Sequence, residues 1–560
     1  MNNQKKWEIL GKIQNPKSKL QIEKIVKVLL ENRGIKTKKD KEEFFNPPNP
    51  ENISLEILGI KRLEVEKAIE RLKKAKKNNE KVIVYGDYDA DGICATAVLW
   101  ETLYEMGFDV LPYIPERFSE GYGLNAESIE NIKIQNSNVK LIITVDNGIV
   151  ANMAVDIANE QGIDVIITDH HLMGRKLPKA HSMIHTTKIG GAAIAWKLAK
   201  EIEKKVKGQR SKVKSSNGLE LAAIGTIADQ MPLTGFNRSF AKYGLAELNH
   251  SVRLGLEELF RQAGIKKGSI GTYEVNFLIA PRLNAMGRME HAIESLRLLC
   301  TGNREKAERL ARRLNEVNQD RQRVVEEVVL HAKGFVANDQ RVIVIAHESY
   351  HEGVIGLAAS KLVEEFHRPA IVISKKAGVA KASARSIPGF NIIETIRKME
   401  SLIIGGGGHS MAAGFSIETK KIKAFSQKLS EISNPLLTDE ILSKRLKIDL
   451  VLDFAQLDFD LYGKLTDFEP TGIGNPKPIF ATEEVEVVGA RVVGRESNHL
   501  KLRLKKAGIA IDAIGFGLGE FLPTLTPEKK IDVAYNLEEN IWNGNKNLQL
   551  KLKDLKISSG

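Results

Sequence analysis

Closely spaced carboxylates are the first feature of this sequence that could do chemistry. Asp87, Asp89 and Asp91 alternate over five residues directly after the apolar run KVIVY. Three like charges at this spacing repel one another unless something positive offsets them. A divalent cation would do so, and carboxylate oxygens are the ligands that Mn²⁺ and Mg²⁺ prefer. The spacing therefore predicts a metal site at this point of the chain.

More acidic side chains and two imidazoles follow at similar places. Asp146 comes after the run VKLIITV, Asp169, His170 and His171 come after DVIIT, and Asp229 lies in the helix-like segment ELAAIGTIADQMPL. Taken alone, such an Asp is more often a helix N-cap or a turn former, and a lone His-His pair is more often structural. The repetition of the pattern after successive apolar runs reverses that balance.

The elements that must position these side chains are short strands. Apolar runs that each end at a carboxylate, with helical patterns between them, predict a parallel sheet covered by helices on both faces. In such α/β sheets, ligands bind beyond the carboxyl ends of the strands. At least five carboxylates and two imidazoles would then face one crevice.

Two cations in that crevice would suit the hydrolysis of phosphate esters. Ions about 4 Å apart can activate a water and hold the phosphate oxygens at the same time. Ligands that are mostly oxygen, with one or two imidazoles, favour Mn²⁺ or Mg²⁺, whereas zinc more often recruits Cys or three His. The sequence leaves the choice between Mn²⁺ and Mg²⁺ open.

The rest of the chain divides by pattern. Apolar residues at helical spacing predict one long helix near 303–335, a second α/β lobe follows it, and five strand-like runs near the end suggest a small barrel of the OB kind. An amphipathic N-terminal arm is expected to dock on the segment after it. The expected divisions are an arm (1–54), a catalytic domain (55–235), a helical extension (236–302), the connecting helix (303–335), a smaller α/β domain (336–430) and the barrel (431–560).

Composition points to the setting in which the protein works. Its 83 Lys and Arg against 71 Asp and Glu give a net charge of +12. This excess favours a polyanionic partner, although solvated lysines alone would look the same. The only cysteines, Cys94 and Cys300, favour a reducing compartment. No apolar leader or membrane-length apolar stretch is evident, so we expect a cytoplasmic protein without membrane contact.

Together these residues resemble a known superfamily. YGDYDADG (85–92), TVDNG (144–148), TDHH (168–171) and GTIADQMPL (225–233) are similar, in this order, to the four motifs of the DHH phosphoesterases. APRLNAMGRM (280–289), ASARSIPGF (382–390), GGGGHSMAAG (405–414) and PTGIGNPKP (470–478) resemble one branch, the bacterial RecJ single-stranded-DNA exonucleases. The resemblance covers nearly the whole chain. It implies a DHH catalytic domain, a DHHA1-type smaller domain and an OB fold that binds single-stranded DNA.

The resemblance also implies roles for the acidic and imidazole groups. One ion would be held by Asp89 and Asp146 with Asp87 as a neighbour, and the other by Asp91, Asp146, His170 and Asp229, so that Asp146 bridges. His171 would meet the substrate phosphate, as an acid or as an electrostatic stabiliser. Asp169 would orient an imidazole. Arg282 resembles a residue close to the scissile phosphate.

Substrate contacts follow from the same resemblance. Arg117, Ser383 and Arg385 resemble a pocket for a terminal 5′-phosphate, which implies exonucleolytic action with 5′→3′ polarity. The run that contains Gly407 and Gly408, with His409 after it, would let backbone N–H groups approach phosphate, unless it is a tight turn. Candidates for stacking on bases are Tyr122, Phe390 and Trp542.

Two features depart from the family pattern. Tyr85 stands where some members have a metal-binding His, so the first ion is expected to depend more on Asp87. The segment HSMIHTTKIGGAAIAWK, which contains His185, is shorter than expected.

The sequence therefore predicts an exonuclease that depends on Mn²⁺ or Mg²⁺ and degrades single-stranded DNA 5′→3′ to mononucleotides in DNA repair and recombination. Its expected partners are single-stranded DNA, a single-strand-binding protein and a helicase, and its expected state is a monomer. Two alternatives stay open: a DHH phosphodiesterase for short oligoribonucleotides or cyclic dinucleotides, and a non-catalytic DNA-binding scaffold.

Overall fold

Val- and Ile-rich runs form a parallel sheet in the computed structural model, which describes residues 5–12, 21–206, 218–337, 339–526 and 530–558. The sheet has five strands in the order β3–β2–β4–β5–β6, and each neighbouring pair is parallel. The strands are β3 (Val110–Tyr113), β2 (Lys81–Tyr85), β4 (Val139–Val145), β5 (Asp164–Asp169) and β6 (Ser182–His185). The expected α/β fold is confirmed.

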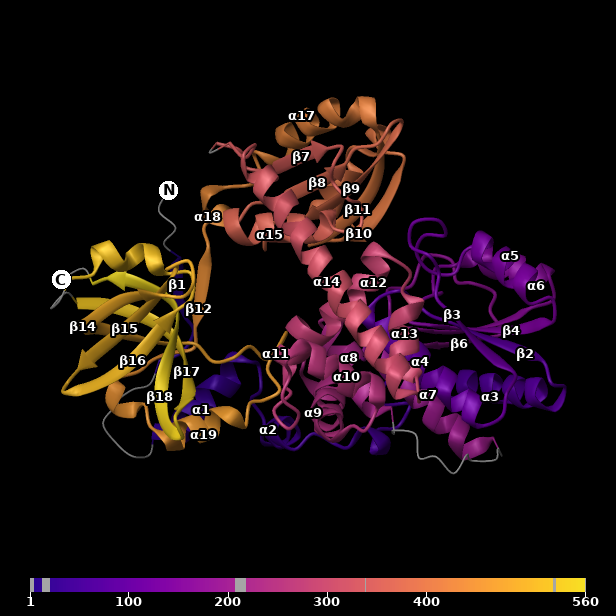
Figure 1. Cartoon of the computed structure of the whole chain (residues 1–560), viewed down its shortest axis with the longest axis horizontal. Coiled ribbons are helices and arrows are strands. Elements are labelled where there is room, and N and C mark those ends of the chain that lie inside the picture. The colour runs from indigo at the N-terminus through magenta and orange to yellow at the C-terminus, as the bar shows by residue number, and fades with distance from the viewer. Residues whose placement is uncertain (1–4, 13–20, 207–217, 338, 527–529, 559–560) are drawn as a thin grey trace.

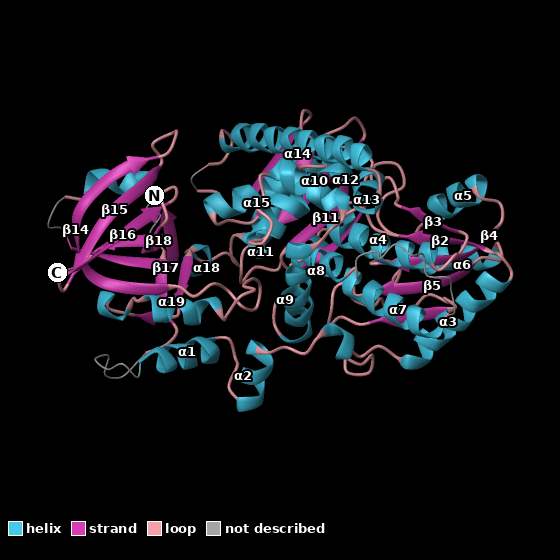
Figure 2. Cartoon of the chain, turned by 60° about the horizontal axis from the view of Figure 1, so that its bottom comes forward, coloured by secondary structure: helices cyan, strands magenta, loops and turns pink. Residues whose placement is uncertain are grey.

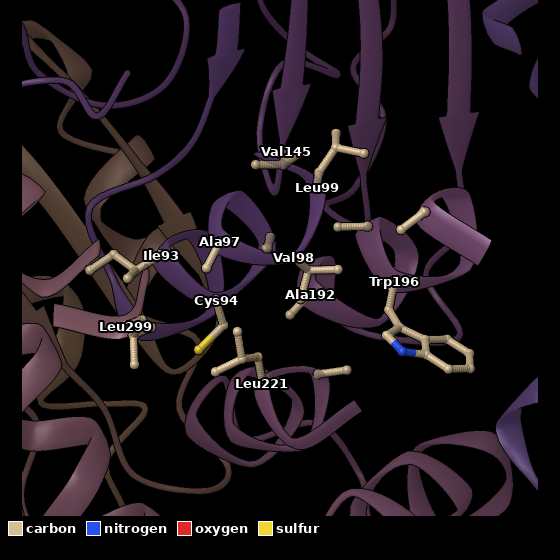
Figure 3. Close-up of a cluster of buried hydrophobic side chains, with 14 of the residues drawn as sticks. Ile93, Cys94, Ala97, Val98, Leu99, Val145, Ala192, Trp196, Leu221 and Leu299 are labelled. Atoms are coloured by element: carbon tan, nitrogen blue, oxygen red, sulfur yellow. The ribbon is translucent and has the colours of Figure 1, made fainter. Parts of the chain in front are cut away.

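Helices cover both faces of this sheet. On one face Val82 and Val84 pack against α3 (Arg62–Lys77), α4 (Ala90–Glu105), α7 (Gly191–Lys205) and α8 (Leu219–Ala228). On the other face Ile83 and Tyr85 pack against α5 (Ala126–Gln135) and α6 (Asn152–Glu160). Figure 3 shows part of the first core, where Cys94 of α4 lies among apolar side chains from neighbouring helices. The period of two along a strand thus fills two separate cores.

A group of helices extends the first core toward the middle of the molecule. It consists of α9 (Gly235–His250), α10 (Leu254–Ala263), α11 (Thr272–Glu274), a π-helical turn (Val275–Ile279), α12 (Ala280–Met289) and α13 (Ile293–Cys300). The long helix α14 (Arg304–Lys333) then leaves this group, as Figure 1 shows. Leu310 and Leu314 belong to the first core, whereas Val325 and Val328 belong to the next. One continuous helix therefore joins two lobes.

The second lobe contains a mixed sheet in the order β10–β11–β9–β8–β7, in which only β7 and β8 are parallel. Its strands are β7 (Ile343–His347), β8 (Ala370–Ser374), β9 (Val379–Arg385), β10 (Gly405–His409) and β11 (Ala412–Glu418), and its helices are α15 (Ile355–Phe366), α16 (Ile392–Arg397) and α17 (Ile422–Ser433). The glycine run is thus an exposed edge strand, and its interpretation as a tight turn is wrong.

The C-terminal strands close into a barrel. The order is β13–β14–β15–β16–β18–β17, and pairing of β14 with β17 completes the ring. The strands are β13 (Leu450–Val451), β14 (Phe480–Val493), β15 (His499–Lys506), β16 (Ile509–Gly515), β17 (Lys530–Trp542) and β18 (Asn545–Ile557), and α19 (Phe459–Thr466) packs beside them. Leu500, Leu502 and Leu504 alternate into the interior, as expected for an OB fold. In Figure 1 the barrel lies at one end and the parallel sheet at the other.

The N-terminal arm packs mainly on the barrel. Strand β1 (Lys6–Ile9) pairs with β12 (Arg445–Ile448), which follows the short helix α18 (Asp439–Leu442), and α1 (Gln21–Asn32) and α2 (Lys38–Phe45) place apolar side chains in the barrel core. Arg33 forms a buried ion pair with Asp449 at 3.2 Å. The expectation that the arm docks chiefly on the segment after it is wrong, because helical periodicity shows that an apolar face exists but not what covers it.

Arg238 of α9 connects the arm, the barrel and the central helices. Its side chain is fully buried and donates hydrogen bonds to the carbonyl oxygens of Phe44, Phe468, Glu469 and Pro470 at 2.6–3.1 Å. Burial lowers the pKa of Arg238 to about 10, so the guanidinium is still charged at neutral pH. This network holds the barrel against the centre. Across the described ranges, no helix combines the length and apolar character needed to cross a membrane.

Candidate metal centre and phosphate pocket

The loop after β2 presents its carboxylates through the first turn of α4. Asp89 caps this helix and accepts hydrogen bonds from the N–H groups of Asp91 and Gly92 at 3.0 Å each. Asp91 accepts the N–H groups of Gly191 and Ala192 at 2.8 and 2.9 Å, at the N-terminus of α7. A helix N-terminus stabilises such an anion. Capping and clustering of carboxylates therefore occur together here.

Asp146 follows β4 in a left-handed conformation, with φ at 64°. Asp and Asn tolerate this region better than other residues that carry a Cβ. The turn brings the Asp146 carboxylate against α7, where a Cβ on residue 191 would overlap Asp146 Oδ1. Glycine at position 191 is therefore required by the position of this carboxylate.

Side chains from four separate segments converge at this edge of the sheet. His170 Nε2 lies 3.0 Å from Asp146 Oδ1, 3.6 Å from Asp229 Oδ2 and 3.9 Å from Asp91 Oδ2. A second group beside it consists of Asp87, Asp89 and Asp146, whose ligand atoms lie within 4.8 Å of one another. Asp146 belongs to both groups.

The donor set fits divalent cations. Asp146 Oδ1 and His170 Nε2 are buried, and neither has a hydrogen-bond partner among the described residues. Buried polar atoms are normally paired, so two unpaired atoms that face each other indicate a shared ligand. Five carboxylates and one or two imidazoles, with no Cys, suit Mn²⁺ or Mg²⁺ better than zinc.

The protonation behaviour of the metal-free cluster supports the same conclusion. Burial and neighbouring carboxylates raise the pKa of Asp91 to about 7 and of Asp229 to about 8. The same causes hold the pKa values of Asp87 and Asp146 well above their ordinary value. Burial and the adjacent His171 lower the pKa of His170 to about 4, so its imidazole is neutral and can ligate. These carboxylates need a cation in order to ionise together.

His171 has a different environment from its neighbour. Burial lowers its pKa, but the hydrogen bond and charge of Asp169 outweigh that effect and raise the pKa to about 9. His171 Nδ1 lies 2.8 Å from Asp169 Oδ1, and its Nε2 lies 3.4 Å from the hydroxyl of Tyr122. His185 Nε2 donates to the His171 carbonyl oxygen at 2.7 Å. The sequence interpretation missed this contact because it places His185 only in a shortened segment.

Tyr85 does not take the place of a metal ligand. It is fully buried, its hydroxyl donates to the Gly123 carbonyl oxygen at 2.9 Å, and its ring stacks on Tyr113 at 5.4 Å. The carboxylate group near it therefore consists of Asp87, Asp89 and Asp146 without help from residue 85.

A polar cavity of about 560 Å³ lies between the first and second lobes. Arg117, Ser383 and Arg385, the predicted contacts of a 5′-phosphate, all line it. Arg385 Nη1 donates to Ser383 Oγ at 3.1 Å and to the Ala384 carbonyl oxygen at 2.9 Å. Of the glycine run, the lining includes Gly405 and Gly406 but not Gly407, Gly408 or His409.

The cavity contains an arginine that the sequence interpretation missed. Burial lowers the pKa of Arg288 to about 10, with further lowering from the nearby Arg117, Arg321 and Arg385. Among the described residues Arg288 has no carboxylate in salt-bridge contact, so this set of arginines favours an anion in the cavity. Arg282 instead donates to Asn315 Oδ1 at 3.1 Å and faces α14; its proposed place near the scissile phosphate stays a prediction.

The aromatic candidates for base stacking fare differently. Phe390 is only 4% exposed and belongs to the core of the second lobe, so this assignment is wrong. Tyr122 is 54% exposed beside His171 and is accessible to a substrate. The side chain of Trp542 lies outside the described residues.

A parallel sheet with an Asp-rich loop after β2, a His-His pair after β5 and a second lobe built on a mixed sheet together define a DHH phosphoesterase. Family models agree with this architecture. They match the DHH family N-terminal domain at residues 81–226, the DHHA1 domain at 339–434 and the RecJ OB domain at 448–554.

Individual relatives narrow the class. The chain is 35% identical over 572 residues to the single-stranded-DNA-specific exonuclease RecJ of Bacillus subtilis (strain 168), with 99% of this chain and 71% of that protein covered. The corresponding protein of Escherichia coli (strain K12) is 30% identical over 523 residues, with 88% and 90% covered. The crystal structure of RecJ in complex with Mn²⁺ from Thermus thermophilus matches with a TM-score of 0.83 and 28% identity, covering 100% of this chain and 81% of that one. The chain belongs to the RecJ family.

Proposed function

We propose that this protein is an exonuclease that depends on Mn²⁺ or Mg²⁺ and hydrolyses single-stranded DNA 5′→3′, releasing 5′-mononucleotides, in DNA repair and recombination. The observation that carries this proposal is the convergence of a buried carboxylate and imidazole cluster beside an arginine-lined cavity. The first can hold cations and the second can hold phosphate.

The proposed ligands follow the two observed groups. Asp87, Asp89 and Asp146 would hold one ion, and Asp91, Asp146, His170 and Asp229 the other. When bound, the two ions lower the pKa of the attacking water and offset negative charge on the scissile phosphate. The hydrogen bonds from Gly191 and Ala192 fix the Asp91 carboxylate in place, so it needs little reorganisation on binding.

His171 supplies charge next to the ions. With a pKa of about 9 it carries a proton at neutral pH, and Asp169 fixes the orientation of its ring. A cationic imidazole can stabilise a phosphate oxygen or protonate a leaving oxygen. Its position beside the exposed ring of Tyr122 keeps it accessible from the substrate side.

The arginine cavity would select the end of the strand. A guanidinium binds a terminal phosphate, with its extra negative charge, more tightly than an internal phosphodiester. Arg117, Ser383 and Arg385 are the proposed contacts, and Arg288 completes the basic lining. A pocket that holds the 5′ end measures cleavage from that end, which supports exonucleolytic action and 5′→3′ polarity.

The setting of the activity is also part of the proposal. We expect a monomer in the cytoplasm, where its cysteines stay reduced, acting with a single-strand-binding protein and a helicase that supply and expose the strand. The net positive charge supports a nucleic-acid partner.

Two alternatives are less well supported. A phosphodiesterase for short oligoribonucleotides or cyclic dinucleotides has little use for a closed barrel, which this chain has. A non-catalytic DNA-binding scaffold has no need of a complete set of acidic ligands, which this chain keeps.

The test is digestion of single-stranded DNA, duplex DNA and RNA, each labelled at either end, with Mn²⁺ or Mg²⁺ and with chelator. We expect mononucleotides from the 5′ end of single-stranded DNA and no product with chelator. Asp146→Asn keeps a residue that tolerates the left-handed conformation but removes the charge, so it should abolish turnover. Internal cleavage, or turnover by this variant, would contradict the proposal.

A further inference from the structure

A second large cavity lies where the barrel meets the central helices. Its volume is about 610 Å³, and its lining comes from α11 and the π-helical turn on one side and from β17, β18 and the loop near residues 469–477 on the other. Figures 1 and 2 both show α11 between the barrel and the central helices. We call this cavity the junction groove.

One wall of the junction groove is aromatic. Tyr273 is 60% exposed and Phe277 is 62% exposed, and their ring centroids lie 4.9 Å apart. Two large rings left in water beside each other cost free energy unless they serve a contact. Adjacent accessible rings are also the platform on which unpaired bases stack, whatever their sequence.

The opposite wall is basic. Lys477, Lys551 and Lys553 line the groove, and Lys5 donates from its ammonium group to the Lys553 carbonyl oxygen at 2.7 Å. Burial lowers the pKa of Lys553, and the charges of Lys551, Lys477 and Lys5 lower it further. On this wall Glu538 is the acidic neighbour, 2.8 Å from Lys477. An anion would relieve this crowding of ammonium groups.

The aromatic wall carries its own carboxylates. Glu274 accepts the N–H of Gly271 at 2.8 Å and thereby caps its own turn, and Glu469 is largely buried beside the Arg238 network. The two walls therefore offer different chemistry, since rings and carboxylates face lysines. A strand whose bases lie toward the rings and whose phosphates lie toward the lysines matches this polarity.

The junction groove connects the metal cluster to the barrel. Gln230, next to Asp229, donates to Asn276 Oδ1 at 2.7 Å, and Asn276 lines the groove. At the other end the Lys551 ammonium lies 5.5 Å from the ring centroid of Phe516, which is 54% exposed on the barrel surface. A strand could thus pass from the metal cluster through the groove onto the barrel.

We propose that the junction groove binds the part of a single DNA strand on the 3′ side of the scissile phosphate, with bases on Tyr273 and Phe277 and phosphates against Lys551 and Lys553. This inference rests on the proposed function, in which the arginine cavity holds the 5′ end. The groove gives grip on a long strand while successive nucleotides are removed. Its specificity is for unpaired, flexible strands rather than for sequence.

The test compares binding of long and short strands with chelator present, so that nothing is cleaved. Each stacked base is worth about 1–3 kcal/mol, so Tyr273→Ala with Phe277→Ala should raise the Kd for an oligothymidylate of about 20 nucleotides at least about 20-fold. A 5′-phosphorylated strand of about three nucleotides should lose much less. The ring-preserving pair Tyr273→Phe and Phe277→Tyr should restore tight binding. Tyr104→Ala, which removes a 61% exposed ring from α4, is the matched control.

The basic wall is tested through salt dependence. Lys551→Gln with Lys553→Gln should reduce the slope of log K against log salt for the long strand by about 1.4, since each phosphate contact contributes about 0.7. Lys423→Gln, on the exposed surface of α17, should leave the slope as it is.

Two results would overturn the inference: long-strand binding by the ring-deleted variant within about 2-fold of the wild type, or equal losses on long and short strands. The failure of the proposed function is separate. If the wild type releases no mononucleotides but the variants still lose long-strand affinity, the groove stands and the exonuclease proposal falls. If the wild type degrades single strands and the variants bind normally, only the groove falls.

Discussion

Asp229→Asn should stabilise the metal-free protein while it removes metal binding. Asp229 is the C-cap of α8, where the helix dipole disfavours an anion, and its carboxylate faces Asp91 and Asp89. No side-chain hydrogen bond to this carboxylate is present among the described residues, so the amide replaces it without a lost partner. The charge at position 229 is therefore unfavourable until a cation binds.

The magnitude follows from the pKa. Burial and the neighbouring carboxylates raise the pKa of Asp229 to about 8. A shift of about four units at about 1.36 kcal/mol each would make the ionised group cost on the order of 5 kcal/mol. Its side chain is 30% exposed and it shares protons with Asp91, so we expect a gain of about 2 kcal/mol.

The sign of the pH dependence is fixed by the same shift. A carboxyl whose pKa is raised by folding binds more protons in the folded state, so its contribution is lost as pH rises from about 4 toward about 8. The stability difference between Asp229→Asn and the wild type should therefore grow over this range. Mn²⁺ should stabilise the wild type most at high pH and the variant much less.

The assay is thermal unfolding with and without Mn²⁺ at several pH values. At about pH 8.5 the metal-free variant should unfold about 4 °C or more above the metal-free wild type, and the order should reverse with Mn²⁺. Glu160→Gln removes an exposed acid from the last turn of α6 and controls for the helix dipole alone. A metal-free variant less stable than the wild type, or one stabilised equally by Mn²⁺, would refute the reasoning.

Three further predictions address other parts of the account. Gly191→Ala puts a Cβ against Asp146 Oδ1 and should weaken Mn²⁺ binding by about 10-fold or more in titration calorimetry, whereas Gly463→Ala, with no atom within 4 Å of the new Cβ, should not; equal affinities would count against the assigned ligand. Arg385→Ala should reduce the preference in kcat/KM for 5′-phosphorylated over 5′-hydroxyl ends by about 10-fold or more, with the exposed Arg397→Ala as control, and an unaltered preference would place the end pocket elsewhere. Arg238→Met leaves at least four carbonyl oxygens without their donor and should expose the 467–470 segment to limited proteolysis; a wild-type cleavage pattern would show that other contacts hold the barrel.

Much of the metal cluster could be predicted from the sequence because parallel strands end at one edge. Apolar runs that stop at Asp87, Asp146 and Asp169 specify both the strands and the side of the sheet on which their polar ends meet. The left-handed turn at Asp146 and the hydrogen bonds that hold Asp91 could not be predicted, since they depend on where α7 lies.

The missed residues share a physical cause. Arg282 and Arg288 are both on α12, which begins directly after a π-helical turn. Such a turn shifts the helical phase, so a period of 3.6 from the preceding residues does not tell which arginine faces the cavity. Tyr273 and Phe277 lie in this same irregular region. Their exposure depends on a barrel that is far away in the sequence, which local pattern does not reveal.

The N-terminal arm shows the same limit for packing. Its amphipathic helix is visible in the spacing of Ile25, Leu29 and Leu30, but the side chains that cover it come from the other end of the chain. A hydrophobic face has no direction along the sequence, so only long-range geometry decides its partner.

The central claim is that one cluster of carboxylates and imidazoles holds two cations. Its most direct test is anomalous diffraction at the manganese absorption edge from crystals grown with Mn²⁺. The account predicts two peaks, one among Asp87, Asp89 and Asp146 and the other among Asp91, Asp146, His170 and Asp229. No peak at Asp146, or manganese bound only elsewhere on the protein, would contradict it.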